Sequence, residues 1–199
     1  MWEENEEIHA SSVGACVAGL KAVKKIPGIE VPNDLIEKGK ESLMKLLPRE
    51  SEKKFVDLAL LSLIYPYNII TSTQREEILK NVEYLLLRKK GVIRYKNDYY
   101  YNKNPDGYSE EAEWCFGLSW LAIIYLKLGR IKKAEFFIKQ MLSIDTKKGV
   151  PELYFSNTNK PNENTPLGWA ESLFIVALHE LNEKHLVKFT LFILTKIST

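Results

Sequence analysis

The segment Trp114–Leu126, which reads WCFGLSWLAIIYL, decides the fold class of this chain. It contains no charged residue, and apolar side chains occur on every side of the helix that it would form. A helix without a polar face has to be covered by other elements all round. We therefore predict a buried inner helix over residues 110–128, capped by Ser109 and closed by Gly129.

A second kind of helix, apolar on one face only, alternates with the first kind along the chain. Residues 55–65 (FVDLALLSLIY) are nearly all apolar, whereas residues 34–47 and 131–142 place apolar side chains on one face. One-faced helices belong on the outside of a helical assembly. The alternation indicates inner and outer rings of helices, as in a double-layered α/α toroid. On periodicity alone, an ordinary helical bundle or an α-solenoid stays open as the alternative.

Further helices complete the predicted all-α architecture. Asn33 is expected to cap residues 34–47, Thr73 and Glu76 have the spacing of a capping box, and Thr165 is expected to cap a helix that begins at Pro166. No convincing strand alternation occurs, so we expect seven to eight helices in a single domain, residues 1–199. The other predicted helices cover residues 9–25, 73–88, 166–181 and 185–197.

Composition excludes several classes of function. The 28 basic and 26 acidic residues nearly cancel, which argues against a nucleic-acid or acidic-lipid partner. No apolar run is long and charge-free enough to span a bilayer, and no secretory signal is visible, so we predict a soluble, cytoplasmic protein. Cys16 and Cys115 are expected to be buried free thiols. The three histidines lack the spacing of a metal site and no phosphate-binding loop occurs, so neither metal nor cofactor is expected.

Two long connections and the first residues of the chain carry most of the reactive side chains. Residues 89–108 contain Arg94 and a run of tyrosines, and residues 143–165 contain Glu152. Each connection precedes an inner helix, as residues 1–5 precede the first one. In an antiparallel double ring, all loops that lead into inner helices open on the same end. We therefore predict that the three segments converge on one face, because loops on a rigid scaffold commonly carry function.

The first residues, MWEEN, place an indole beside two adjacent carboxyl groups. Acid catalysis on a sugar needs these residue types, because an apolar wall and a second acid keep a carboxyl protonated. The other candidates have two interpretations when taken alone. Glu152 after Pro151 is either functional or an ordinary surface residue, and Trp169 is either a sugar-stacking platform or a core residue.

Five motifs follow one another along the chain: Trp2-Glu3-Glu4, Asp57 in VDLALL, Ile93-Arg94-Tyr95 followed by Glu113-Trp114, Gly129-Arg130, and Gly149-Val150-Pro151-Glu152 followed by Pro166-Leu167-Gly168-Trp169. In this order they resemble the catalytic domain of glycoside hydrolase family fifteen, the glucoamylase family. The resemblance implies an (α/α)6 barrel that releases glucose from the non-reducing ends of α-glucans with inversion.

The resemblance also implies roles for single residues. Glu3 would be the general acid and Glu152 the general base, and inversion requires their carboxyl groups to stand about 6.5–9.5 Å apart. The side chains that would line the first glucose subsite are those of Trp2, Glu4, Arg94, Trp114 and Trp169. The substrate would be an α-linked glucan or disaccharide. Trehalose or an α-1,6-glucan is the alternative substrate within the family, and a non-catalytic α/α scaffold that binds glycans or proteins is the alternative outside it.

The chain departs from the family in its length. The general acid of the family lies near the middle of the domain, whereas Glu3 lies at the start of this sequence. We therefore expect an incomplete toroid that corresponds to the C-terminal part of the catalytic domain, inactive or very weak when isolated. Its exposed apolar edges are expected to bind a missing N-terminal half or a second copy of the chain.

Overall fold

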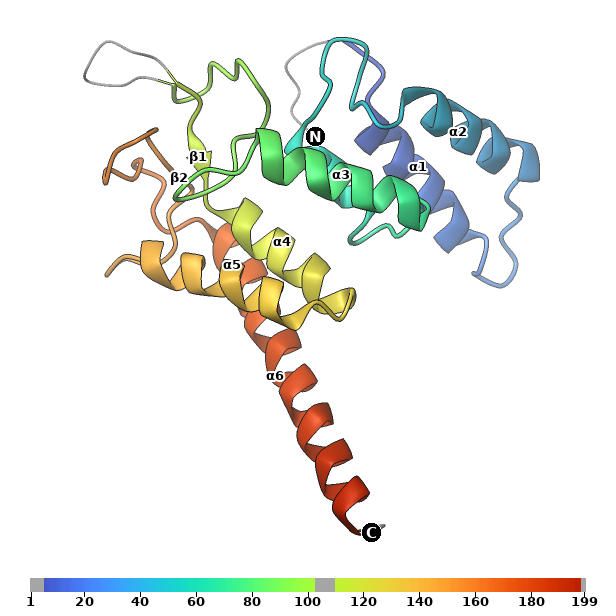
Figure 1. Cartoon of the computed structure of the whole chain (residues 1–199). Coiled ribbons are helices and arrows are strands. Elements are labelled where there is room, and N and C mark those ends of the chain that lie inside the picture. Colours follow the sequence, from blue (N-terminus) through green and yellow to red (C-terminus); the bar gives the residue numbers. More distant parts are fainter. Residues whose placement is uncertain (1–5, 103–109, 198–199) are drawn as a thin grey trace. The chain divides into compact units, whose positions relative to one another are not determined.

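The computed structural model describes residues 6–102 and 110–197, with side chains as far as residue 184. These residues form six α-helices, one 3-10 helix and a two-stranded sheet (Figure 1), which confirms the all-α class. The antiparallel sheet pairs β1 (Glu113–Trp114) with β2 (Leu153–Tyr154). The helices are α1 (Ala10–Val23), α2 (Asn33–Leu46), η1 (Leu58–Leu63), α3 (Ser72–Leu85), α4 (Phe116–Lys127), α5 (Ile131–Ile144) and α6 (Gly168–Ile197).

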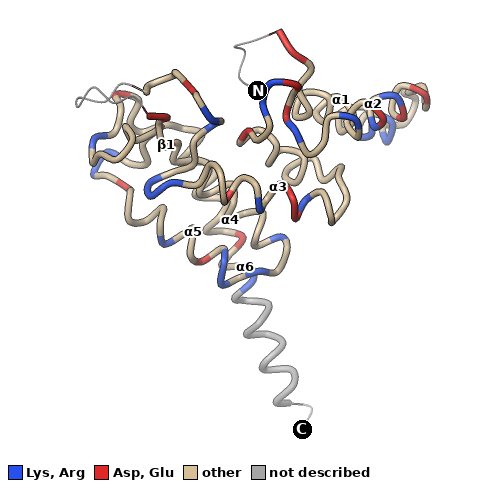
Figure 2. Tube along the Cα trace, turned by 45° about the horizontal axis from the view of Figure 1, so that its top comes forward, with Lys and Arg blue, Asp and Glu red and all other residues tan. Residues whose placement is uncertain are grey.

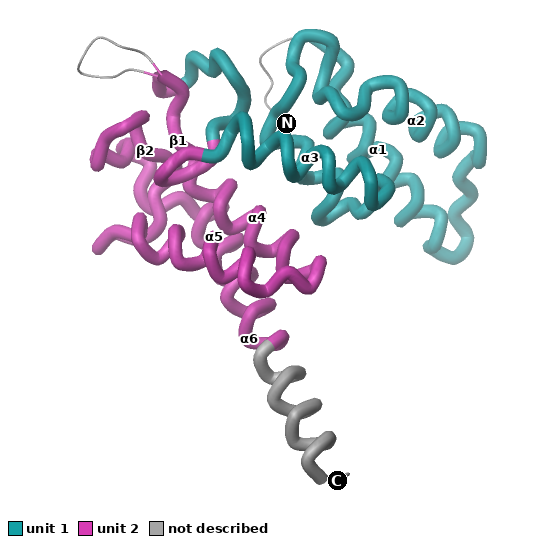
Figure 3. The backbone as a smooth tube through the Cα atoms, in the orientation of Figure 1, with its two compact units in different colours: residues 1–87, 93–100 teal, residues 88–92, 101–199 magenta. Residues whose placement is uncertain are grey.

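The chain divides into two compact units, which Figure 3 colours separately. Unit 1 comprises residues 1–87 and 93–100 and holds α1, α2, η1 and α3. Unit 2 comprises residues 88–92 and 101–199 and holds α4, α5, α6 and the sheet. The organisation of the chain as one domain stays a prediction.

In unit 2, α4 is the inner helix that the sequence predicts. Every residue from Phe116 to Leu126 is buried, and α4 packs against both α5 and α6. Helix α5 buries one face and exposes Lys132 and Lys133, as expected of an outer helix. Helix α4 begins at Phe116 instead of residue 110, because Glu113 and Trp114 pair with β2 as a strand. Residues 185–197 continue α6 as one helix instead of forming a separate one.

In unit 1, α1 packs against α2 and η1, and α3 packs against η1. Helix α2 buries only Ile36 and Leu43, and acidic and basic residues are spread along it (Figure 2). The six residues of η1 are all buried, as predicted, but they form a 3-10 helix instead of an α-helix. Two contacts explain its start: the Asp57 carboxylate accepts a hydrogen bond from the Ala59 amide, and the Leu58 amide donates to the Arg94 carbonyl.

The predicted caps of α2 and α6 are wrong. Asn33 is the first residue of α2, and its side chain accepts a hydrogen bond from Lys24 instead of capping the helix. Thr165 does not cap α6, which begins at Gly168; its hydroxyl donates to the Asn162 carbonyl at 2.9 Å. For Asn33, the contact with Lys24 occupies the oxygen that a cap would use; α6 begins three residues after Thr165, too far for Thr165 to be its N-cap.

The capping box of α3 lies two residues before the predicted one. The Thr71 hydroxyl accepts a hydrogen bond from the Gln74 amide at 3.3 Å, and the Gln74 side chain accepts one from the Thr71 amide at 2.9 Å. The sequence TSTQREE contains two overlapping pairs with this spacing, Thr71 with Gln74 and Thr73 with Glu76. The pattern predicts a box but does not choose between them.

Replacing Thr71 by Ala should lower the free energy of unfolding by about 1 kcal/mol, because the first turn of α3 loses its side-chain acceptor. Thr73→Ala is the matched control. It removes a hydroxyl from the same turn without removing a cap, so its effect should stay within about 0.5 kcal/mol. Urea unfolding of the two variants measures the difference, and equal losses would contradict the assignment of the cap.

The two cysteines differ in exposure. Cys115 is buried, as predicted, and burial together with the negative charge of Glu113 raises the pKa of its thiol. The prediction for Cys16 is wrong, because this residue is exposed. Helix α1 turns Ala10, Gly14 and Val17 inward, and Cys16 lies outside that face.

Within the described part of the chain, no helix is long and apolar enough to cross a membrane.

Candidate functional site

The predicted site residues are distributed over both units. Trp114, Glu152 and Trp169 lie in unit 2, whereas Arg94 lies in unit 1. The predicted acid Glu3 and its neighbours Trp2 and Glu4 lie outside the described residues, as does the predicted cap Ser109. The separation between the carboxyl groups of Glu3 and Glu152 therefore stays a prediction.

The backbone of Glu152 is held from two sides. Its amide donates a hydrogen bond to the Asn164 carbonyl at 3.1 Å, and its carbonyl accepts one from the Cys115 amide at 3.0 Å. Cys115 directly precedes α4, and Trp114, the residue before it, pairs in the sheet with Leu153, the residue after Glu152. Glu152 is thus attached to the start of the buried helix, although it lies in a long loop.

The carboxylate of Glu152 is held by one oxygen only. Its Oε2 accepts hydrogen bonds from Asn162 Nδ2 at 2.5 Å and from Asn164 Nδ2 at 2.8 Å. Its Oε1 accepts no hydrogen bond from the residues that the structure describes, and no described Lys or Arg forms an ion pair with it. The side chain is half-buried. This arrangement fixes a carboxylate and leaves one oxygen for a water molecule.

An aromatic cluster surrounds the start of α4 in the same unit. The ring of Trp169 stacks on that of Phe116, with centroids 4.2 Å apart and planes 16° apart, and Trp120 adjoins both rings. Trp169 is 41% exposed, whereas Trp114, in β1, is 5% exposed. Trp169 packs on the core and also presents aromatic surface, so its role as a sugar-stacking platform stays a prediction.

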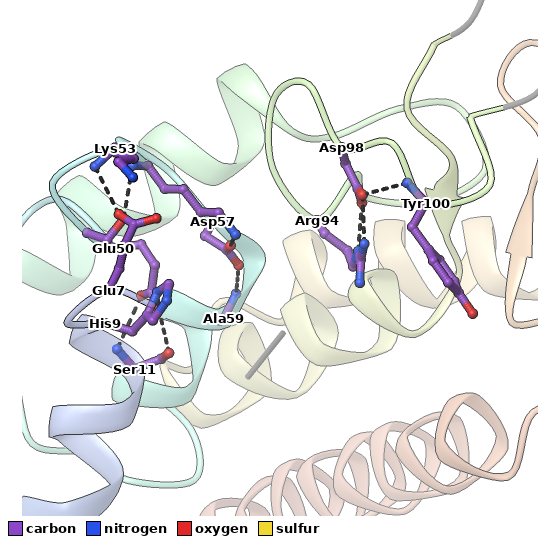
Figure 4. A network of polar contacts seen from close by, with 12 residues as sticks. Glu7, His9, Ser11, Glu50, Lys53, Asp57, Ala59, Arg94, Asp98 and Tyr100 are labelled. Atoms are coloured by element: carbon purple, nitrogen blue, oxygen red, sulfur yellow. Dashed lines mark hydrogen bonds and ion pairs between the residues drawn. The ribbon is translucent and has the colours of Figure 1, made fainter. Parts of the chain in front are cut away.

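Arg94 forms a buried ion pair in unit 1. Its Nε and Nη2 atoms each lie 2.6 Å from an oxygen of Asp98, and the Tyr100 amide donates to Asp98 Oδ1 at 3.0 Å (Figure 4). The guanidinium carbon lies 5.0 Å from the centroid of the Tyr100 ring. The bidentate pair orients the planar guanidinium group and fixes the shape of this loop.

A second buried acid, Glu50, holds the N-terminus of α1. Its backbone carbonyl accepts a hydrogen bond from the Ala10 amide at 2.7 Å, and its carboxylate accepts from both the amide and the hydroxyl of Ser11 (Figure 4). His9 Nδ1 lies 3.4 Å from the same carboxylate. Burial, and after it the negative charge of Asp57, raises the pKa of Glu50 to about 8. No sequence pattern singled out this residue.

Asn162 and Asn164 were also not predicted. They follow Glu152 by ten and twelve residues, in the polar run NTNKPNENT. Their spacing of two residues, which places both side chains on one side of an extended segment, is the one sequence signal that could have indicated them. Among the described residues no group of three or more His, Cys, Asp or Glu side chains is placed to hold a metal ion.

Comparison with known proteins gives three similar sequences. No family model matches the chain. It is 25% identical over 221 residues to an uncharacterized glycosyl hydrolase of Methanocaldococcus jannaschii, an alignment that covers 94% of this chain and 34% of the relative. It is 28% identical to a probable phosphorylase b kinase regulatory subunit alpha of Caenorhabditis elegans, and 27% identical to the liver isoform of that subunit from Mus musculus. These alignments cover 88% and 89% of this chain and 18% of each subunit, so the chain spans about a third or less of its curated relatives.

A solved structure described as a wild-type glycosidase has a similar fold. The TM-score is 0.72 at 18% sequence identity, and the match covers 91% of this chain and 54% of the glycosidase. The chain therefore has an all-α fold similar to that of this solved glycosidase.

Proposed function

We propose that the chain is part of an inverting glycoside hydrolase of the glucoamylase type, which releases glucose from the non-reducing ends of α-linked glucans. The observation that carries the proposal is the geometry of Glu152, whose Oε2 is held by two amides while Oε1 is left for water. The glycosidase-type fold and the similarity to an archaeal glycosyl hydrolase support it.

In the proposed mechanism, Glu152 is the general base. Its Oε1 takes a proton from a water molecule while the oxygen of that water attacks the anomeric carbon from the side opposite the leaving group. Glu3 is the proposed general acid, which protonates the leaving oxygen. Trp169 offers an exposed ring for a sugar to stack on. The role of Arg94 in the subsite is a proposal that rests on the resemblance of its motif. Trp2, Glu4 and Trp114 complete the proposed first glucose subsite.

We also propose that full activity needs a partner. The chain spans 54% of the glycosidase whose fold it shares, and Leu35 and Met44 of α2 and Ile175 of α6 are exposed apolar residues. A polypeptide that supplies the remaining helices of the fold would cover such residues. A second copy of this chain is the competing occupant.

The second candidate function is a non-catalytic α/α scaffold. It is favoured by the similarity to two proteins that are regulatory subunits by name. In that case Glu152 and its neighbours would bind a glycan or a protein without turnover. Within the catalytic proposal, trehalose and α-1,6-glucans are the competing substrates.

Incubation with maltotriose, isomaltose and trehalose tests the proposal, with the anomeric proton of the released glucose followed by NMR. We expect β-glucose to accumulate first from maltotriose, because a single displacement inverts the anomeric carbon. The assay is run on the chain alone and on the chain co-expressed with a polypeptide that supplies the remaining helices of the fold. Initial release of α-glucose would contradict inversion, and absence of glucose in both preparations would favour the scaffold.

A further inference from the structure

The hairpin that carries Glu152 places two asparagines on its carboxylate. We propose that Asn162 and Asn164 are positioning residues for Glu152, which hold Oε2 and thereby present Oε1 to the attacking water. This inference rests on the proposed function of Glu152 as a general base. It assigns to two further residues the task of orienting that base.

The backbone explains why both asparagines reach the same side chain. Residues 161–164 run antiparallel to residues 152–154: the Glu152 amide bonds to the Asn164 carbonyl, and the Asn162 amide bonds to the Leu153 carbonyl at 3.2 Å. Tyr154 forms an isolated bridge with Pro161 in the same direction. Residues two apart in an extended segment share one side. The register therefore directs both amide groups towards Glu152.

Two donors on one oxygen restrict the orientation of the carboxylate and leave its other oxygen without a donor. The terminal torsion of a glutamate is otherwise broad, so an unheld carboxylate samples many orientations. With Oε2 held at 2.5 and 2.8 Å, rotation about that torsion breaks two hydrogen bonds. Oε1 accepts none from the described residues, so its lone pairs are available to a water proton.

Asn162 has a feature that stability alone does not explain. Its side chain is 4% exposed, and its Oδ1 has no hydrogen-bond partner among the described residues. A buried amide oxygen without a partner is unfavourable. The unpartnered Oδ1 of an asparagine in this place therefore costs stability. The hydrogen bond from Nδ2 to Glu152 offsets this cost, and an apolar residue would not have it. The presence of a residue with such a penalty fits a role in function.

The best probe is α-glucosyl fluoride. Fluoride leaves without a proton, so hydrolysis of this substrate depends on the general base but not on Glu3. The bond from carbon to fluorine breaks, the bond from the water oxygen to the anomeric carbon forms, and the water proton passes to Oε1 of Glu152 and then to solvent. The products are β-glucose and fluoride, and a fluoride electrode measures the rate.

Asn162→Ala and Asn164→Ala should each lower kcat on this substrate by about 10–100-fold, because a small misplacement of a catalytic group has effects of this size. KM should change by less than about threefold, since both amides contact Glu152 and the proposal gives them no substrate contact. Asn159→Ala is the matched control in the same loop. Asn159 is exposed and its side chain accepts a hydrogen bond from Lys90, so its loss should leave kcat unchanged.

A double-mutant cycle separates positioning from general damage. If Asn164 acts through Glu152, Asn164→Ala should have no further effect on kcat in a Glu152→Ala background. Equal fold-losses in both backgrounds, or wild-type kcat in both asparagine variants, would overturn the inference while leaving the proposed function intact. If neither the chain alone nor its co-expressed form hydrolyses the fluoride, the proposed function fails and the inference fails with it. Asn164 is exposed, so its variant remains informative even if Asn162→Ala does not fold.

Discussion

Glu152→Gln is expected to lower kcat for the release of glucose by about 10²–10⁴-fold, the usual contribution of a general base. Glutamine keeps the shape of the side chain, and its amide oxygen can still accept hydrogen bonds from Asn162 and Asn164. It cannot take a proton from water, so the chemical step loses its base while the loop keeps its contacts. Initial rates on maltotriose, together with circular dichroism of the folded chain, measure both parts of this prediction.

Two further variants make the result specific. Glu163→Gln changes an exposed carboxylate in the same loop, whose partner is the Tyr101 hydroxyl, and should retain kcat within about twofold, the scale of a surface change. Glu152→Ala leaves space for a small anion, so added azide should restore turnover of α-glucosyl fluoride and give β-glucosyl azide. Wild-type turnover by Glu152→Gln would remove the proposed mechanism.

Glu50→Gln is expected to flatten the pH dependence of stability. The ordinary pKa of a Glu carboxyl is 4.5, whereas burial and the nearby Asp57 raise that of Glu50 to about 8 in the folded chain. Below about pH 4.5 both folded and unfolded chains hold the proton, and its contribution to stability is fully present. Between about pH 4.5 and 8 only the folded chain holds it, so stability falls as the pH rises, by about 1.4 kcal/mol per unit. Above about pH 8 this contribution is lost.

The variant removes this contribution because glutamine has no proton to lose. It also keeps hydrogen bonding to Ser11, since its oxygen accepts from the amide and its nitrogen donates to the hydroxyl. Chemical unfolding at several pH values between 4.5 and 9 measures the difference in unfolding free energy between wild type and variant. Glu52→Gln, an exposed carboxyl two residues away, is the control and should follow the wild type. If the difference between Glu50→Gln and wild type were the same at every pH, the buried carboxyl would not be the cause.

The all-α class, and which helices are buried and which lie outside, could be predicted from the sequence because both depend on local patterns. The charge-free run after Trp114 has to be buried, and the one-faced pattern of residues 131–142 has to lie outside it. The 3-10 geometry of η1 was not predictable in this way. Its first residue, Leu58, donates a hydrogen bond to Arg94, a residue more than thirty positions away in the sequence, and no local pattern contains that contact. The predicted cap of α3 was wrong for a different reason, because the sequence contains two overlapping pairs with the spacing of a capping box.

The candidate site divides in the same manner. Glu152 could be named from a motif, and Trp169 from its residue type and place at the start of a predicted helix. The two asparagines could not, because their role depends on the register between residues 152–154 and 161–164. Glu50 could not be found either, since its contact with Ser11 joins segments 39 residues apart. Register and long-range contacts arise from packing, which no local pattern contains.

The unequal exposure of the two cysteines supplies a chemical reporter on the candidate site. A thiol reagent should label Cys16 quickly, whereas Cys115 is buried and the raised pKa of its thiol keeps it in the unreactive protonated form. The Cys115 amide donates a hydrogen bond to the Glu152 carbonyl, so the buried thiol belongs to the residue that anchors the Glu152 loop to the start of α4. The rate at which the second thiol becomes labelled therefore measures how often the start of α4, to which Glu152 is anchored, becomes exposed, without a substrate and without an introduced probe.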